Sequence, residues 1–161
     1  MNKTALAALL AAFAATPADA ANMYAGIKLG KARYDITGVT TPPNAIGVFG
    51  GYTFNPNLAV EAEYIDLGSN GTSSATVMDV SALLFYPGDA PFSLYAKLSY
   101  ASSTWKAPNQ VQYNSSFTYG LGCQYDASKS LSFRFGWDRY MIGNQVAINA
   151  DVLGVAGMVR F

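Results

Sequence analysis

The residues of this chain that could do chemistry are ionisable side chains that alternate with apolar ones. Glu61 and Glu63 are the clearest pair, because two carboxylates at positions i and i+2 of a strand share one face and could act as general acid and base. The chain contains no histidine, which removes a serine–histidine nucleophile pair and the usual zinc ligands. We therefore expect no enzyme, no cofactor and no metal site.

The elements that must position these side chains are strands. From residue 23 onward, about ten residues of alternating polarity are followed by a turn or a polar loop, a repeat that is typical of transmembrane β-barrels. The expected strands cover residues 23–33, 45–54, 58–67, 77–86, 92–105, 116–126, 130–140 and 147–161. The predicted fold is all-β, an eight-stranded antiparallel up-and-down transmembrane β-barrel.

The connections between these strands alternate in length. Three are short turns rich in Pro, Gly, Asn, Asp and Ser, namely 55–57, 87–91 and 127–129. The other four, 34–44, 68–76, 106–115 and 141–146, include longer polar loops. In outer-membrane barrels the short turns are periplasmic and the longer loops extracellular. An even number of strands then puts both termini of the mature chain on the periplasmic side.

The parity of the alternation decides which face meets lipid. One face is apolar in every strand, and its polar members lie at strand ends: Lys31, Asp66, Ser102, Thr104 and Arg139. The opposite face carries Lys28, Glu61, Glu63, Asp79, Ser81, Lys97, Gln124, Arg134 and Asp138. A lysine or arginine facing lipid at mid-bilayer costs about 2–4 kcal/mol, so the charged face must be interior. A soluble, lipocalin-like barrel would have the opposite parity.

Aromatic residues of the apolar face form two bands, as expected for girdles at the two membrane interfaces. The band on the turn side comprises Phe54, Tyr86, Phe92 and Phe161, and the band on the loop side comprises Tyr64, Tyr100, Phe117 and Trp137.

The first twenty residues are expected to be a cleaved signal peptide, with residues 21–161 forming the barrel domain. Lys3 provides a basic start, residues 5–15 are apolar, and Ala18-Asp19-Ala20 is a small-x-small cleavage site. The apolar run is shorter than the roughly 20 residues that a spanning helix needs. The ten basic and ten acidic residues balance, so we expect no nucleic-acid partner.

The other end of the chain alternates up to a terminal aromatic residue. Phe161, Val159, Val155 and Leu153 share one face of the final strand. A terminal aromatic at the end of such a strand resembles the sorting signal of bacterial outer-membrane barrels. It implies that the barrel-assembly machinery is a partner.

Several segments in order resemble the transmembrane domain of outer membrane protein A. They are Tyr24-Ala25-Gly26-Ile27-Lys28-Leu29-Gly30, Phe49-Gly50-Gly51-Tyr52, Asn55-Pro56 followed by Val60-Glu61, Leu94-Tyr95-Ala96-Lys97-Leu98, and Arg134. The resemblance covers the mature chain and is to a short, barrel-only form, without the family's peptidoglycan-binding domain. It implies an interior charge network that blocks the lumen, with Lys28, Glu61, Lys97 and Arg134 at matching positions.

On this basis we predict a Glu61–Arg134 ion pair, with Lys28 and Lys97 balancing Glu63 and Asp79. Leu83 and Gln124 depart from the family pattern, since they stand where it would allow a base and an acid. A static polar plug is therefore expected rather than gating by exchange of ion-pair partners.

Two functions are compatible with these features. One is a structural role in membrane integrity, with at most a narrow porin-like channel. The alternative is an adhesin or surface binding module, for which only loops 34–44 and 106–115 are large enough, with an unidentified ligand. In both cases we expect an integral protein of the bacterial outer membrane in contact with membrane lipids and lipopolysaccharide.

Overall fold

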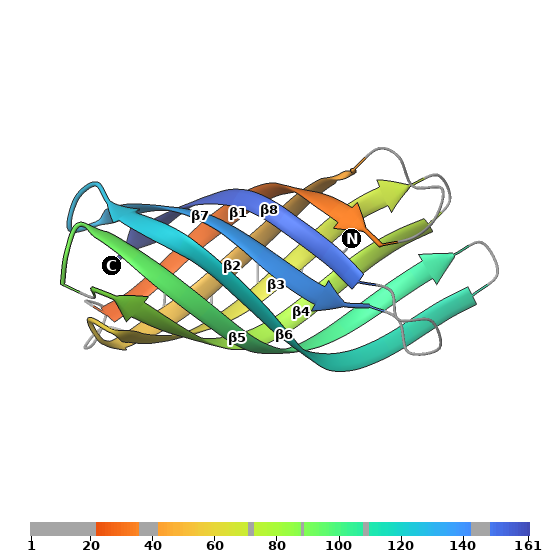
Figure 1. The fold of residues 1–161 in the computed structure, drawn as a ribbon, viewed down its shortest axis with the longest axis horizontal. Coiled ribbons are helices and arrows are strands. Elements are labelled where there is room, and N and C mark those ends of the chain that lie inside the picture. The colour runs from red at the N-terminus through yellow and green to blue at the C-terminus, as the bar shows by residue number, and fades with distance from the viewer. Residues whose placement is uncertain (1–21, 36–41, 71–72, 88, 108–109, 143–148) are drawn as a thin grey trace.

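The computed structural model describes residues 22–35, 42–70, 73–87, 89–107, 110–142 and 149–161. Within these ranges eight strands follow one another around a closed barrel, and each is antiparallel to its neighbours (Figure 1). This confirms the fold class predicted from the sequence. No helix in the described ranges is long and apolar enough to cross a membrane. The expected signal peptide, residues 1–20, lies outside the described residues.

The strands have the following bounds: β1 Met23–Tyr34, β2 Asn44–Asn55, β3 Leu58–Asn70, β4 Ser73–Tyr86, β5 Phe92–Ala107, β6 Gln110–Asp126, β7 Leu131–Met141 and β8 Asn149–Arg160. The barrel is closed by pairing of β1 with β8, in a register that runs from Tyr24 opposite Arg160 to Tyr34 opposite Ala150. Closure leaves neither the first nor the last strand with an open edge along this pairing.

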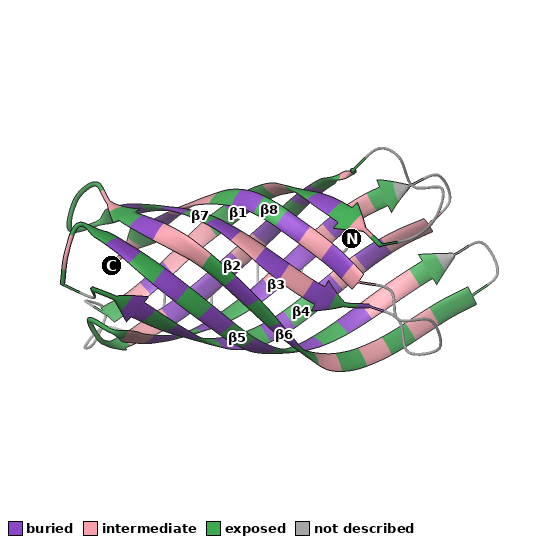
Figure 2. Ribbon diagram, in the orientation of Figure 1, coloured by how far each residue is buried: buried purple, intermediate pink, exposed green. Residues whose placement is uncertain are grey.

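Burial alternates along each strand, as the bands in Figure 2 show. Ile27 is 58% exposed while its neighbour Lys28 is 9% exposed, and Leu98 is 60% exposed while Lys97 is 5% exposed. The outward residues are mainly apolar and the buried ones include the charged residues of the predicted interior face. The sidedness expected from the sequence is therefore confirmed.

The connections at the end where β1 begins and β8 ends are tight. In the β2–β3 turn, Asn57 N donates to the Asn55 side chain at 2.9 Å, which forms an Asx turn. The side chain of Asn57 also donates to the Phe85 carbonyl at 3.0 Å. In the β6–β7 turn, the backbone amides of Ser130 and Leu131 both donate to Ser128 Oγ. Two of the three short turns predicted from composition therefore have local side-chain support.

Two of the expected long loops are instead mostly strand. β3 and β4 extend to Asn70 and Ser73, and β5 and β6 extend to Ala107 and Gln110, so the predictions of loops at 68–76 and 106–115 are wrong. The polar residues of these segments can pair across strands because the ladder is made by backbone groups, and their composition marks only where the apolar alternation stops. The middles of the other two loops, 36–41 and 143–148, lie outside the described residues.

Gly68 lies at an irregularity in the pairing of β3 with β4. The register between β3 and β4 shifts between Asp66 and Ser69, and Gly68 adopts a positive φ of 77° there. Its amide donates to Asp66 Oδ1 at 2.8 Å. Glycine reaches this backbone region without the steric cost of a Cβ, so the strand absorbs the irregularity and resumes pairing.

Two apolar clusters fill the interior on either side of the charged residues. The cluster on the side of the longer loops consists of Ala32, Ala45, Ile65, Leu67, Ala75, Val77, Ala101, Tyr140, Ile142, Ala150 and Val152. The cluster on the side of the tight turns consists of Tyr24, Phe49, Ala59, Leu83, Phe85, Tyr95 and Met158. We call them the loop-side cluster and the turn-side cluster.

Candidate functional site

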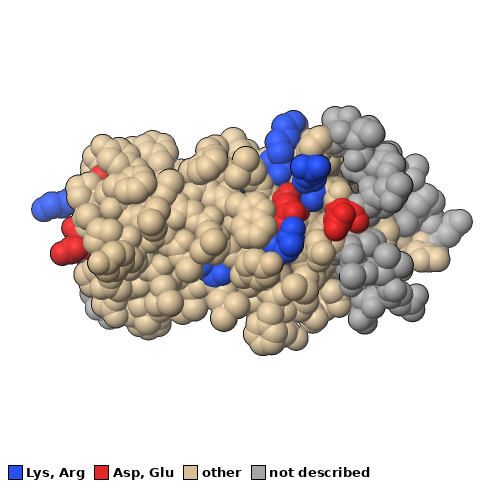
Figure 3. Space-filling view, in the orientation of Figure 1, with Lys and Arg blue, Asp and Glu red and all other residues tan. Residues whose placement is uncertain are grey.

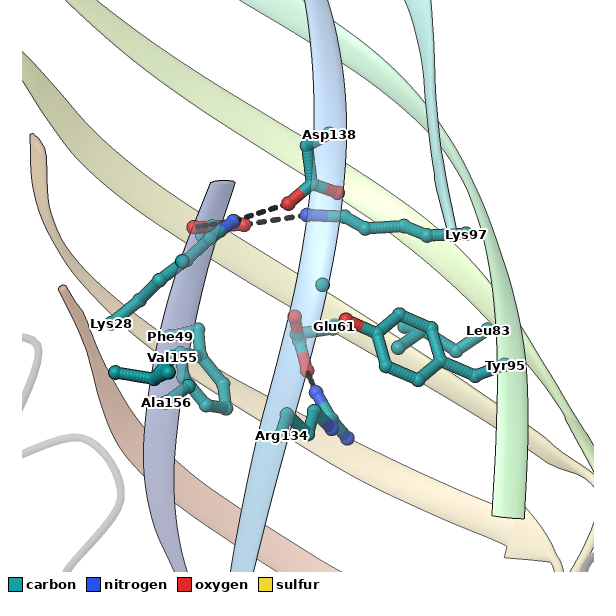
Figure 4. Close-up of a pocket in the computed structure, with 13 residues that line it drawn as sticks. Lys28, Phe49, Glu61, Leu83, Tyr95, Lys97, Arg134, Asp138, Val155 and Ala156 are labelled. Atoms are coloured by element: carbon teal, nitrogen blue, oxygen red, sulfur yellow. Dashed lines mark hydrogen bonds and ion pairs between the residues drawn. The ribbon is translucent and has the colours of Figure 1, made fainter. Parts of the chain in front are cut away.

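The candidate site is a layer of charged side chains between these two clusters. Strands β1, β3, β4, β5 and β7 contribute Lys28, Glu61, Glu63, Asp79, Lys97, Arg134 and Asp138, each at most 9% exposed. All are at inward positions of the alternation, so the pleat of the strands aims them at the barrel axis. Figure 4 shows Lys28, Glu61, Lys97, Arg134 and Asp138 converging from different strands. We call this set the charge layer.

Glu63 is the centre of the larger ion-pair group. Its two carboxylate oxygens accept from two lysines, Lys28 Nζ at 3.0 Å and Lys97 Nζ at 2.5 Å. Lys28 Nζ also donates to Asp138 Oδ2 at 2.6 Å. The hydroxyl of Tyr140 donates to Glu63 Oε2 at 3.5 Å. Buried charges need such partners, because each one has lost its hydration.

Glu61 and Arg134 form a second group nearer the tight turns. Arg134 Nη1 donates to Glu61 Oε2 at 2.5 Å, and the Tyr24 hydroxyl donates to the same oxygen at 3.0 Å. Arg134 Nε donates to Gln124 Oε1 at 2.8 Å. Gln124 in turn donates to Asp126, which accepts from Arg160. The buried guanidinium is thus connected to the turn-side mouth of the barrel.

Aromatic rings surround the Arg134 guanidinium. Its Cζ lies 5.2–5.6 Å from the ring centroids of four residues: Tyr24, Phe49, Phe85 and Tyr95. The faces of aromatic rings attract cations, and all four rings belong to the turn-side cluster. The position of Arg134 is therefore suited to a cation and not simply to any polar side chain.

Asp79 is the least well satisfied member of the charge layer. Among the described residues its only ion-pair partner is Lys97, whose Nζ lies 3.4 Å from the carboxylate. Asp79 Oδ1 has no hydrogen-bond partner. The layer holds four carboxylates and three cations, and so a formal charge of −1. Asp79 is the carboxylate with the weakest compensation.

The free space within the charge layer is small. A cavity of about 20 Å³ lies between Lys28, Glu61, Lys97 and Arg134, which is little more than the space needed for one water molecule. Beyond it on either side lie the apolar clusters, in which side chains such as Ile65 and Leu83 are at most 1% exposed. Along the described residues the lumen is therefore filled by side chains, as expected for eight strands.

The structure brings together all six residues that the sequence singled out for the network: Lys28, Glu61, Glu63, Asp79, Lys97 and Arg134. It places Leu83 in the turn-side cluster and Gln124 beside Arg134. Sequence reasoning missed the parts played by Asp138, Tyr24 and Tyr140. The parity of the strands was the available signal, because Tyr24 and Tyr140 lie on the same faces as Lys28 and Asp138.

The residues of the expected assembly signal lie on the outer surface. Phe161, Val159, Val155 and Leu153 are all about half exposed. Phe161 N donates to the Met23 carbonyl at 3.0 Å, so the last residue continues the β1–β8 pairing. No group of three or more His, Cys, Asp or Glu side chains in the described part of the chain is arranged to hold a metal ion.

Comparison with known proteins decides the family. Residues 4–161 match the model of the outer membrane protein beta-barrel domain family. The chain belongs to this family. It is therefore an integral β-barrel protein of the bacterial outer membrane. No curated protein matches this chain.

Solved structures of outer-membrane barrels have the same fold. Neisserial surface protein A (NspA) is 16% identical to this chain and superposes with a TM-score of 0.67. The match covers 86% of this chain and 97% of NspA. Ail, the attachment invasion locus protein of Yersinia pestis, is 15% identical with a TM-score of 0.57 over 87% and 97% of the two chains. The N-terminal barrel domain of Pseudomonas aeruginosa OprF is 13% identical with a TM-score of 0.58 over 84% and 96%. At these identities the likeness concerns the fold alone.

Proposed function

We propose that the protein is a non-catalytic, non-conducting barrel with a structural role in the integrity of the outer membrane. The observation that carries this proposal is that three layers of side chains fill the lumen one after another: the turn-side cluster, the charge layer and the loop-side cluster. An ion would have to pass the turn-side cluster, a charge layer whose cations and carboxylates are paired, and then the loop-side cluster. Apolar constrictions exclude ions by dewetting, and two of them in series make a continuous aqueous path unfavourable.

Planar-bilayer recording of the purified protein tests the absence of a channel. We expect no steady conductance for the wild type. We also expect none for Leu83→Ala, because this substitution leaves the charge layer and the loop-side cluster in place. The outward-facing Leu84→Ala is the matched control, since Leu84 is 60% exposed. A steady ohmic conductance of the wild-type protein would show that the barrel is a pore.

The structural role itself requires a test in cells. A strain that lacks the protein should take up more of a hydrophobic dye and be more sensitive to detergent. Expression of the wild-type protein should correct both defects. Variants with substitutions at exposed residues of the loops should correct them equally well. Normal dye uptake and detergent resistance in the strain that lacks the protein would argue against a role in membrane integrity.

We further propose the orientation and processing of the chain. Residues 1–20 would be removed on export, the tight turns and both mature termini would face the periplasm, and the loops would face outward. The outward face of β8, with Leu153, Val155, Val159 and Phe161, would be read by the barrel-assembly machinery. Protease treatment of intact cells that carry an epitope in loop 34–44 or in the β2–β3 turn would test the orientation, because only the loop epitope should be removed.

A second candidate function is surface binding, and one observation favours it. β6 pairs with β5 as far as Gln110 but with β7 only from Tyr119 onward. Beyond β7 the β5–β6 ribbon therefore presents exposed apolar residues, with Val111 51% and Tyr113 73% exposed. Val111→Ser with Tyr113→Ser should reduce adhesion to host cells if the ribbon binds a partner. An unchanged adhesion, with unchanged folding, would leave the structural role alone.

A further inference from the structure

A basic patch lies on the outer surface of the barrel close to the loop end. Lys31 and Arg33 are outward-facing residues of β1, and Arg139 is an outward-facing residue of β7. Asp151 of β8 stands between the two strands, since it is paired with Arg33 on one side and with Arg139 on the other. Figure 3 shows these charges gathered on one face next to the loop end, whereas most of the adjoining surface is uncharged.

The carboxylates of the region do not neutralise the patch. Asp151 is engaged by Arg139, whose Nε and Nη2 each donate to it at 2.7 Å. Within the described residues, neither Lys31 nor Arg33 has a carboxylate at ion-pair distance. Asp35 follows Arg33 by two positions and is exposed. Three cations and two carboxylates thus leave a positive excess, and the cations without an ion pair are both on β1.

The patch borders directly on the lipid-facing surface. Lys31 is paired across the β1–β8 ladder with Leu153, and the next outward pair is Leu29 with Val155. These apolar residues are about half exposed and outward. A lysine at such a boundary extends its ammonium group away from the hydrocarbon and toward the headgroups. Trp137 lies beside the patch. The Cζ atom of Arg139 is 5.5 Å from the centroid of the Trp137 ring.

We propose that this patch binds the phosphate of an anionic lipid in the outer leaflet, with Lys31 and Arg33 as the principal phosphate ligands and Arg139 held beside them by Asp151. A lipid fits better than a soluble anion because charge and apolar surface adjoin here. The acyl chains would lie on Leu29, Leu153 and Val155 while the phosphate meets the cations. Lys and Arg are the side chains that bind phosphate most strongly.

Among the described residues of the opposite side of the barrel, formed by β3, β4 and β5, there is no such patch. One row of outward cross-strand partners on that side consists of Asp66 of β3, Thr76 of β4 and Thr104 of β5, none of which is a cation. On the described part of that side, Lys106 of β5 is the outward-facing cation nearest the loop end. It provides a control for surface charge in general, because it faces outward, its cross-strand partners are Ser74 and Val111, and it has no second cation beside it.

Lipid-dependent quenching of Trp137 tests the proposal. The chain has two tryptophans, so Trp105→Phe leaves Trp137 as the single reporter. The protein is reconstituted in phosphatidylcholine vesicles that contain either brominated phosphatidic acid or brominated phosphatidylcholine. We expect phosphatidic acid to quench Trp137 at lower mole fractions. Its relative association should fall by roughly fivefold for each cation removed in Lys31→Gln and Arg33→Gln, and should be unchanged in Lys106→Gln.

Three outcomes would overturn the proposal. The first is an equal preference for phosphatidic acid in the Lys31→Gln/Arg33→Gln double variant and the parent. The second is an equal loss in Lys106→Gln, which would indicate only general surface charge. The third is displacement of the lipid by inorganic phosphate or by a soluble sulfated oligosaccharide, which would make the patch a site for soluble anions. Electrophoretic mobility before and after boiling verifies that each variant is folded. Since lipid preference and conductance are measured separately, this proposal can fail while the proposed non-conducting role stands, and the reverse.

Discussion

The pairing of Glu61 with Arg134 makes the most demanding prediction for stability. Arg134→Met keeps much of the side chain's length but removes its charge. Glu61, which is 4% exposed, would then keep, among the described residues, only the Tyr24 hydroxyl as a side-chain partner. Removing one partner of a buried ion pair costs about 3–5 kcal/mol, because the other charge is left without compensation. The loss of ring contacts to the guanidinium adds to this cost.

A double-mutant cycle separates the pair from its surroundings. Glu61→Gln should also be destabilising, since the guanidinium would lose its carboxylate while staying buried. The double variant should lose less than the sum of the two single variants, with a coupling energy of about 2–3 kcal/mol. Reversing both charges should allow folding where either reversal alone impairs it. We expect this recovery to be partial, because the four rings around position 134 favour a cation over a carboxylate.

Urea titration of the protein in lipid vesicles supplies the measurement, with the folded fraction read from electrophoretic mobility without boiling. Arg139→Met is the matched control. It breaks an ion pair with Asp151 that is partly exposed, and exposed pairs contribute little to stability. A coupling energy below about 0.5 kcal/mol, the level at which independent sites add, would refute the reasoning that the two side chains depend on each other.

Three further predictions concern the outer surface and the interior packing. Val155→Arg places a charge on the lipid-facing side and should destabilise the barrel by about 2–4 kcal/mol in vesicles; an unchanged urea midpoint would place this residue away from hydrocarbon. Gly136→Ala should lower the stability of the barrel by about 1–3 kcal/mol, because its Cβ would overlap the Tyr95 hydroxyl. Tyr95→Phe in the same chain should recover part of that stability. No recovery would mean that another contact is responsible. Cys123, half-buried on the outward side, should resist a membrane-impermeant maleimide in vesicles. The control Ser128→Cys, in the exposed turn, should react. Equal labelling of the two positions would show that the outward face near Cys123 is in water.

Much of the fold could be predicted because the physical signal is local. Alternation with a period of two is a property of each strand, and lipid exposure makes one face apolar along its whole membrane-spanning length. This was enough to place Lys28, Glu61 and Arg134 inside before any contact was known. The extent of β6 could not be predicted in the same way. Its first residues, from Gln110 to Ser116, are polar apart from Val111 and Tyr113, and their strand structure depends on pairing with β5.

The sequence by itself determined the sidedness of the barrel, because the cost of a charge in hydrocarbon acts on each residue separately. Only the tertiary structure decided the partners. Lys28 meets Asp138 across 110 positions of the chain, and that distance closes only when β1 pairs with β8 and the registers of the intervening strands are set. Tertiary structure also decides the partners of the inward apolar residues of the loop-side cluster. A side chain such as Ile65 is apolar although it faces inward, and closure of all eight strands is what gives it other apolar side chains to pack against.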